Sequence, residues 1–277
     1  MTRAWRTHRV VEQFVAAKRA GVVSEDIACD LGTFVVLLDG ITSTDGATYA
    51  GLTGGRFAAE TVLAAWAGLS PEVSAGVALD AVTAALHEAV VTAAGVFPAN
   101  PPGVVLAVYS PARGEVWRVG DIHVRLGGVH LPTEAPPTDA IATSFRAALL
   151  EAYLAGGATP ESLIADDPSW SAMLPLLSRQ HMFANLDEAH PLGYGVVNGT
   201  TVPARHLQVH PVAPGTEVVL ASDGYFSADG DLAAAEAAIA HALATDPLLI
   251  RGYQGFRPAQ AGGSFDDRCW IRFTTAL

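Results

Sequence analysis

The feature that most constrains the fold is an apolar run that stops abruptly at an acidic residue. Residues 33–40 read TFVVLLDG and follow a glycine at position 32. A continuous apolar run of this length between glycines predicts a buried strand. Asp39 then lies where the strand leaves the core, on a rigid base. The sequence therefore predicts a carboxylate held in a fixed position at the rim of the core.

The same arrangement occurs at two other places in the chain. Residues 218–224 read VVLASDG and end in Asp223, and Asp266-Asp267 opens the apolar run at 269–271. A single Asp-Gly is common in turns and by itself predicts only a turn. Several carboxylates at one place repel one another unless a cation lies between them. Such oxygen ligands suit Mg²⁺ or Mn²⁺, and two bridged ions would activate a water and clamp a phosphoryl group. The set therefore predicts a divalent metal site.

An antiparallel hairpin would add two more acidic residues to this set. Residues 27–30 and 34–38 are short apolar runs separated by a glycine-containing turn. In a hairpin the start of the first strand lies beside the end of the second. We therefore expect Glu25 and Asp26 to lie near Asp39.

Composition limits the class of protein. The chain has 277 residues, half of them hydrophobic, and a net charge of −12. This length supports a sizeable core, and the acidic balance argues against nucleic acid as a partner. No run of about 18 uninterrupted apolar residues is present, so no membrane span is predicted. Cys29 and Cys269 lack a Cys-x-x-Cys spacing and fit small buried residues in a reducing compartment. We therefore expect a cytoplasmic protein.

Several strands follow one another without intervening helices. Short runs at 104–109, 115–119 and 122–126 are joined by turns, which predicts an antiparallel meander. The amphipathic, basic segment at 5–20 fits either a short helix or an irregular arm. Residues 206–212 and 217–222 flank Ala-Pro-Gly and predict a second hairpin.

The whole pattern predicts an α+β fold. Consecutive strands without crossovers exclude a doubly wound parallel sheet. We expect two mainly antiparallel sheets that pack together, with helix pairs outside, as one domain over 1–277. Residues 129–205 look like an insertion or flap-like region. The expected helices are at 55–69, 71–94, 137–157, 169–184 and 231–245, and a last strand is expected at 269–273.

The acidic blocks, taken in order, resemble the metal-dependent type 2C (PPM) serine/threonine protein phosphatases. The blocks span nearly the whole chain and are Glu25-Asp26, LDG at 38–40, VGDIH at 119–123, ASDG at 221–224 and Asp267-Arg268. The resemblance implies a four-layer αββα sandwich. It also implies hydrolysis of phosphoserine or phosphothreonine in proteins, or of a small phosphorylated metabolite, by attack of a water that bridges two metals.

The resemblance further implies a role for each matching residue, with two or three Mg²⁺ or Mn²⁺ ions as cofactor. Asp26 would be catalytic and would orient the attacking water. Asp39 would bridge two ions, and Asp121 would help to hold a third. The full ligand set would be Glu25, Asp39, the Gly40 carbonyl, Asp121, Asp223 and Asp267.

Several positions depart from the family pattern. Thr42-Ser43 stands where bacterial members usually have a Gly-Gly turn. Ile41 stands where many members have a histidine, Gly21 where they have a phosphate-binding arginine, and Arg268 where they have an asparagine. Arg19 and Lys18 are the candidate replacements for the missing arginine. These departures motivate a second hypothesis, a non-catalytic module that binds metal or a partner through residues 129–205. A third is another metal-assisted reaction, because fold alone does not fix function.

Overall fold

A computed structural model describes residues 8–187, 189–259 and 263–277. The strands are β1 (His8–Ala16), β2 (Ile27–Asp30), β3 (Val35–Gly40), β4 (Thr48–Tyr49), β5 (Leu52–Thr53), β6 (Val104–Ser110), β7 (Glu115–Val119), β8 (His123–Leu126), β9 (Val129–Leu131), β10 (Gln208–Pro211), β11 (Glu217–Ala221) and β12 (Arg268–Thr275). The helices are α1 (Gly54–Ala67), α2 (Ala75–Ala94), α3 (Pro137–Ala155), α4 (Pro160–Ala165), α5 (Ser169–Leu177) and α6 (Leu232–Thr245), with 3₁₀ turns at Gln180–Phe183 and Ala204–His206.

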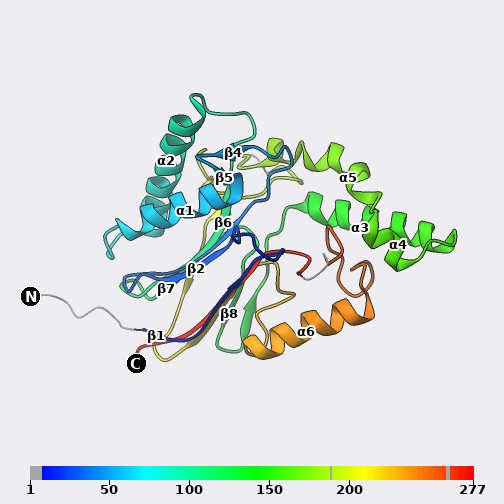
Figure 1. The fold of residues 1–277 in the computed structure, drawn as a ribbon. Coiled ribbons are helices and arrows are strands. Elements are labelled where there is room, and N and C mark those ends of the chain that lie inside the picture. The colour runs from blue at the N-terminus through cyan, green and yellow to red at the C-terminus, as the bar shows by residue number, and fades with distance from the viewer. Residues whose placement is uncertain (1–7, 188, 260–262) are drawn as a thin grey trace, which may run out of the picture.

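Two antiparallel sheets form the centre of the molecule (Figure 1). One sheet has the order β1-β12-β11-β8-β9, and the other has the order β10-β7-β6-β3-β2. In Figure 1 the helices α1 and α2 lie on the outer face of the second sheet, and α6 lies on the outer face of the first. The predicted four-layer αββα sandwich is confirmed. One outer layer is a helix pair, and the other combines α6 with the irregular segment that follows it.

The apolar run of β3 is continuous because both faces of this strand are covered. Val35 and Leu37 pack between the two sheets, whereas Val36 and Leu38 pack against α1 and α2. All four side chains are fully buried. Burying an aliphatic side chain of this size contributes about 1.5–3 kcal/mol. The strand is therefore a rigid base for Asp39, as predicted.

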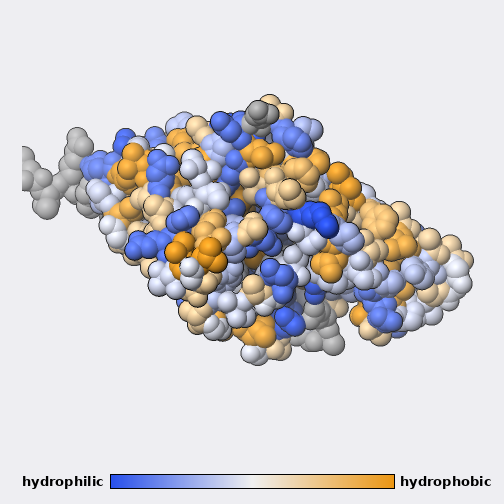
Figure 2. All heavy atoms as spheres, turned by 90° about the horizontal axis from the view of Figure 1, so that it is seen from above, coloured by the Kyte–Doolittle hydropathy of each residue, from blue (hydrophilic) through white to orange (hydrophobic). Residues whose placement is uncertain are grey.

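Helix α2 is long and apolar enough, by length and composition alone, to cross a membrane. However, Leu79, Val82 and Leu86 on one face of α2 are buried in the cluster that includes α1 and β3. This is the packing of a core helix on a sheet. Seen from above in Figure 2, hydrophilic and hydrophobic residues are interspersed over the surface.

The prediction for residues 5–20 is wrong in both of its forms. Residues 8–16 form β1, whose side chains alternate between half-buried and exposed, and residues 5–7 lie outside the described chain. The strand pairs antiparallel with β12, and Glu12 accepts hydrogen bonds from Arg272 at 2.7 and 2.8 Å. This hydrogen-bond partner of Glu12 lies on a strand that follows more than 250 residues later. The sequence around residues 8–16 does not reveal this partner strand.

The meander and the second hairpin are also corrected. β7 pairs with β6 and β10, but β8 pairs with β11 and β9 in the other sheet. β10 and β11 likewise belong to different sheets. A short turn can also join strands that belong to two packed sheets, so turn residues alone do not distinguish the two cases.

Most predicted helices are present near their expected bounds, but the one at 169–184 ends at Leu177 as α5. The hairpin of β2 and β3 is confirmed. Residues 129–205 contain β9, α3, α4 and α5, and the three helices lie together at one end of the sandwich (Figure 1). The division of the chain into a core and an insertion stays a prediction.

Candidate functional site

Seven carboxylates lie together where strands end, and we call them the acidic cluster. Asp39 is the last residue but one of β3, and Asp223 lies two residues after β11. Burial raises the pKa of Asp39 well above its ordinary value, and the charges of four other members of the cluster add to the effect. The predicted residues are therefore brought together in space. The cluster consists of Glu25, Asp26, Asp39, Asp121, Asp223, Asp266 and Asp267.

The glycines of the two Asp-Gly pairs are required by close backbone contacts. Neither Gly40 nor Gly224 has a positive φ. A Cβ at Gly40 would lie 2.7 Å from the carbonyl oxygen of Glu25, and one at Gly224 would lie 2.0 Å from the carbonyl oxygen of Asp267. No side chain fits at such distances. The glycines thus hold Glu25 beside β3 and Asp267 beside the end of β11, which argues against ordinary turn dipeptides.

Part of the cluster has no neighbouring cation, and we call Asp26, Asp39, Asp121 and Asp223 the Asp223 side. Within the described residues, none of these four has a basic nitrogen within 4 Å of its carboxylate. Burial, and then the charge of Asp121, raise the pKa of Asp223 to about 6, although a hydrogen bond with Asp39 lowers it. Burial raises the pKa of Asp121 to about 7. These groups resist full ionisation unless a cation joins them.

The other carboxylates of the cluster lie around Lys18. We call Glu25 and Asp267, together with Lys18 and the neighbouring Thr42, the Glu25 side. The Lys18 Nζ atom lies 3.2 Å from Glu25 Oε2, 3.1 Å from Asp267 Oδ2 and 2.7 Å from Thr42 Oγ1. Burial alone would lower the pKa of Lys18, but Asp266, Asp267 and Glu25 outweigh it and raise this pKa. Asp266, 3.7 Å from the ammonium, lies between the two sides.

Asp26 carries a buried oxygen that no described residue satisfies. The side chain of Asp26 is hydrogen-bonded to Ser222, whose Oγ accepts the Cys269 N–H at 2.8 Å. Asp26 Oδ2 is buried and has no hydrogen-bond partner within the described chain. Buried polar atoms are rarely left unpaired, so this oxygen is a candidate contact for a water or a ligand. Burial raises the pKa of Asp26 well above its ordinary value.

The two sides differ in how well they fit a divalent metal. In the described residues, no three His, Cys, Asp or Glu side chains converge as a ready-made metal site. On the Asp223 side, Asp39 and Asp223 are hydrogen-bonded to each other, and ionisation would free these oxygens for a hard cation such as Mg²⁺. The donor chemistry fits a metal there. The Glu25 side already contains an ammonium.

The structure also places the remaining predicted residue and the positions that depart from the family pattern. Arg19 is exposed and forms no ion pair or side-chain hydrogen bond with any described residue. Gly21 lies in the exposed turn after β1, with φ +78°. Ile41 is exposed next to Gly40, and the Arg268 guanidinium pairs with Glu236 of α6. The role of Arg19 in substrate binding stays a prediction.

Sequence reasoning missed several residues near the cluster. Asp266 was noted only as the neighbour of Asp267, yet burial and then the charge of Asp223 raise its pKa to about 7. Burial also raises the pKa of Asp139, in the first turn of α3, to about 7, and Asp223 adds to this. The Tyr253 hydroxyl donates to the Asp223 carbonyl at 3.3 Å. The Asp-Asp pair was a usable signal, whereas Asp139 and Tyr253 had none.

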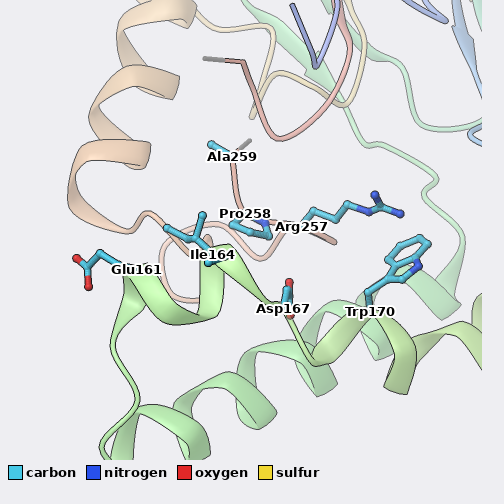
Figure 3. Close-up of a pocket in the computed structure, with 8 residues that line it drawn as sticks. Glu161, Ile164, Asp167, Trp170, Arg257, Pro258 and Ala259 are labelled. Atoms are coloured by element: carbon cyan, nitrogen blue, oxygen red, sulfur yellow. The ribbon is translucent and has the colours of Figure 1, made fainter. Parts of the chain in front are cut away.

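A cavity of about 680 Å³ lies between α4, α5 and the segment after α6, and it holds a second cation (Figure 3). The Arg257 guanidinium carbon lies 3.6 Å from the centroid of the Trp170 ring, a cation–π contact. Burial lowers the pKa of Arg257, and the charge of Asp266 opposes this. Within the described residues Arg257 has no carboxylate within 4 Å. It is therefore a cation that remains available to an anionic ligand.

Comparison with known proteins supports the fold. No protein-family model and no curated protein matches the sequence. The structure of the Mycobacterium tuberculosis serine/threonine phosphatase PstP/Ppp is similar, with 17% identity, a TM-score of 0.51, and coverage of 98% of this chain and 100% of that one. The PstP catalytic domain in complex with two manganese ions gives the same values. The PPM phosphatase MsPP from Mycobacterium smegmatis has 18% identity, a TM-score of 0.46, and coverage of 96% and 97%.

The chain thus has the fold of the PPM serine/threonine phosphatases over nearly its whole length, in a divergent sequence.

Proposed function

We propose that this protein is a metal-dependent phosphatase that hydrolyses phosphomonoesters. The observation that carries the proposal is the Asp223 side: four buried or half-buried carboxylates without a nearby basic group, around the unpaired Asp26 Oδ2. Such a set needs a hard cation, which for oxygen ligands is Mg²⁺ or Mn²⁺. The similarity of the fold to a phosphatase solved with two manganese ions supports this choice.

The residues of the Asp223 side have separate tasks. Asp39, Asp121 and Asp223 would hold the divalent cation, with Asp266 and the Gly40 carbonyl next to them. When bound, the metal would supply the positive charge that stabilises the phosphoryl oxygens and activates water. Asp26 would accept a proton from the attacking water through Oδ2, and its raised pKa suits it to hold that proton. As the water oxygen bonds to phosphorus, the P–O bond to the substrate would break, and the departing alkoxide would take up a proton from solvent to leave as the alcohol.

The substrate would be a phosphoserine or phosphothreonine protein, or a small phosphorylated metabolite. Arg257, which lines the cavity and holds its guanidinium over the Trp170 ring, is our candidate for the group that binds an anionic part of the substrate (Figure 3). Arg257 would do the work of the phosphate-binding arginine that is missing at position 21. We prefer it to Arg19, which is exposed. We further propose a cytoplasmic protein without nucleic-acid or membrane partners, supported by the acidic composition and by the free thiols of Cys29 and Cys269.

The experiment is hydrolysis of p-nitrophenyl phosphate with Mn²⁺ or Mg²⁺. Asp39→Asn and Asp223→Asn should each abolish metal-dependent turnover, a loss of about 10³-fold or more, because each removes a charge from the cation site. Asp229→Asn is the matched control, since this carboxylate is exposed and outside the cluster. Wild-type turnover in both cluster variants would show that the assignment is wrong.

A second candidate is a non-catalytic module of the same fold. Ile41 places an exposed apolar side chain beside the cluster, where the family resemblance leads one to expect a histidine. Such a surface favours contact with a partner over proton transfer to a leaving group. Metal binding without turnover on a broad panel of phosphopeptides and phosphorylated metabolites would favour this candidate.

A further inference from the structure

The starting observation is that Lys18 is the only lysine in the chain. All other permanently charged basic side chains are arginines. An ammonium is a compact point charge with three donors, whereas a guanidinium is a planar fork. The one lysine lies inside the acidic cluster, with only 17% of its side chain exposed.

The backbone of Lys18 is fixed by the segment that leads into β12. The Lys18 N–H donates to Asp267 Oδ1 at 2.8 Å, and the Lys18 carbonyl accepts the Ser264 N–H at 3.0 Å. A Cβ at Gly263 would lie 2.2 Å from this carbonyl oxygen, so only glycine permits the contact. The backbone N–H and the carbonyl of Lys18 are therefore both held, and this fixes the position from which the side chain reaches the cluster.

The ammonium has its hydrogen bonds satisfied. Its three N–H groups match three acceptors, Glu25 Oε2, Asp267 Oδ2 and Thr42 Oγ1, all within 3.2 Å. Thr42 in turn donates to the same Glu25 oxygen at 2.6 Å. A metal ion bound to Glu25 would have to displace these contacts and would repel the ammonium. Glu25 is therefore committed to Lys18.

We propose that the Lys18 ammonium takes the place of one divalent ion, so that the acidic cluster binds metal on the Asp223 side only. Glu25 is then a positioning residue for Lys18 and not a metal ligand. The inference shares with the proposed function the requirement that the cluster binds metal, but it does not require turnover.

The test counts Mn²⁺ ions per chain after equilibrium dialysis of the full chain, by elemental analysis. Lys18→Met removes the charge and keeps most of the side-chain length, so this variant should bind one more Mn²⁺ than the wild type. Adding Glu25→Gln to Lys18→Met should remove the extra ion. Glu25→Gln alone should leave the wild-type count unchanged, because Glu25 binds no metal while Lys18 is present. Lys18→Arg, which keeps the charge, is the control and should not gain an ion.

Each outcome decides the question. Equal counts in the wild type and Lys18→Met, or loss of an ion in Glu25→Gln alone, would overturn the inference, as would a wild type that binds no Mn²⁺. If Lys18→Met does not fold, as judged by circular dichroism, the Glu25→Gln count decides by itself. A chain that gains the extra ion yet hydrolyses no phosphomonoester supports the inference and rejects the proposed function.

Discussion

The two sides of the acidic cluster are built from the same kind of residue but obtain their positive charge differently. On the Glu25 side, Lys18 lies within 3.2 Å of two carboxylates. On the Asp223 side, no described basic group lies within 4 Å of the four carboxylates, and burial raises the pKa values of all four. A cluster of carboxylates is therefore not uniformly a metal site. Where the chain supplies its own cation, the need for a metal is removed.

The largest expected effect comes from removing that internal cation. Without metal, Lys18→Met leaves Glu25 and Asp267 buried without their partner. Breaking a buried pair from one side costs on the order of 3–5 kcal/mol of unfolding free energy. Urea unfolding in EDTA at pH 7.5 measures this loss of stability. If a metal can replace the Lys18 charge on the Glu25 side, Mn²⁺ added in place of EDTA should restore part of the lost stability. A loss below about 1 kcal/mol, the size for surface pairs, would contradict the burial of the pair.

The contact that joins the two sides should be the next most sensitive. Gly224→Ala would place a Cβ 2.0 Å from the Asp267 carbonyl oxygen. Overpacking of this kind costs typically about 1–3 kcal/mol, and the shift would also move Asp223. We expect a lower melting temperature and a smaller stabilisation by Mn²⁺ in thermal unfolding. Gly252→Ala is the control, because a Cβ there meets nothing within 4 Å. Equal stability of the two variants would argue against a tight contact.

The free energy of unfolding should depend on pH because the carboxyl of Asp139, near the Asp223 side, is partly buried. Burial raises the pKa of Asp139 to about 7 in the folded chain, above the ordinary value of 3.8. The folded state then binds more protons than the unfolded state between these values, so stability falls as pH rises from about 4 to about 7. Asp139→Asn removes this penalty while Gln180, which donates to Asp139 Oδ1 at 2.6 Å, keeps an acceptor.

In metal-free buffer we expect Asp139→Asn to be about 1–3 kcal/mol more stable than wild type at pH 8, with the difference vanishing near pH 4. Urea unfolding across this pH range is the measurement. Asp80→Asn, at an exposed position of α2, should show no such trend. A constant difference at all pH values would mean that Asp139 affects stability through packing and not through its charge.

The smallest expected effect concerns the second cation, Arg257. Arg257→Gln should raise the KM for a phosphopeptide about tenfold, equivalent to about 1.4 kcal/mol, because it removes the charge that would receive the substrate anion. The value of kcat should change less. Arg251→Gln is the matched control, since Arg251 is exposed and pairs with Glu151. A change in kcat alone would place Arg257 in the chemical step and not in substrate binding.

The sequence predicted the elements of the fold correctly where a local pattern shows which faces of a strand or helix are buried. The run of β3, the amphipathic stripes of α1 and α2, and the glycine turn between β2 and β3 each carry their signal within a few residues. The order of the acidic blocks also predicted the αββα sandwich. In contrast, β1 and the change of sheet between β7 and β8 depend on strands distant in the sequence. No window of residues around them contains that information.

The sequence by itself indicated most of the carboxylates that gather, because each of these lies in an apolar strand that must be buried or within two residues of its end, but it did not single out Asp266. Only the tertiary structure decided which of them have a cation. Lys18 reaches Glu25 and Asp267 because β1 pairs with β12, and this places residue 18 beside residue 267. Charge balance in a buried site depends on distances of a few ångströms. Such distances are fixed by strand pairing and backbone contact, which spacing along the chain does not reveal.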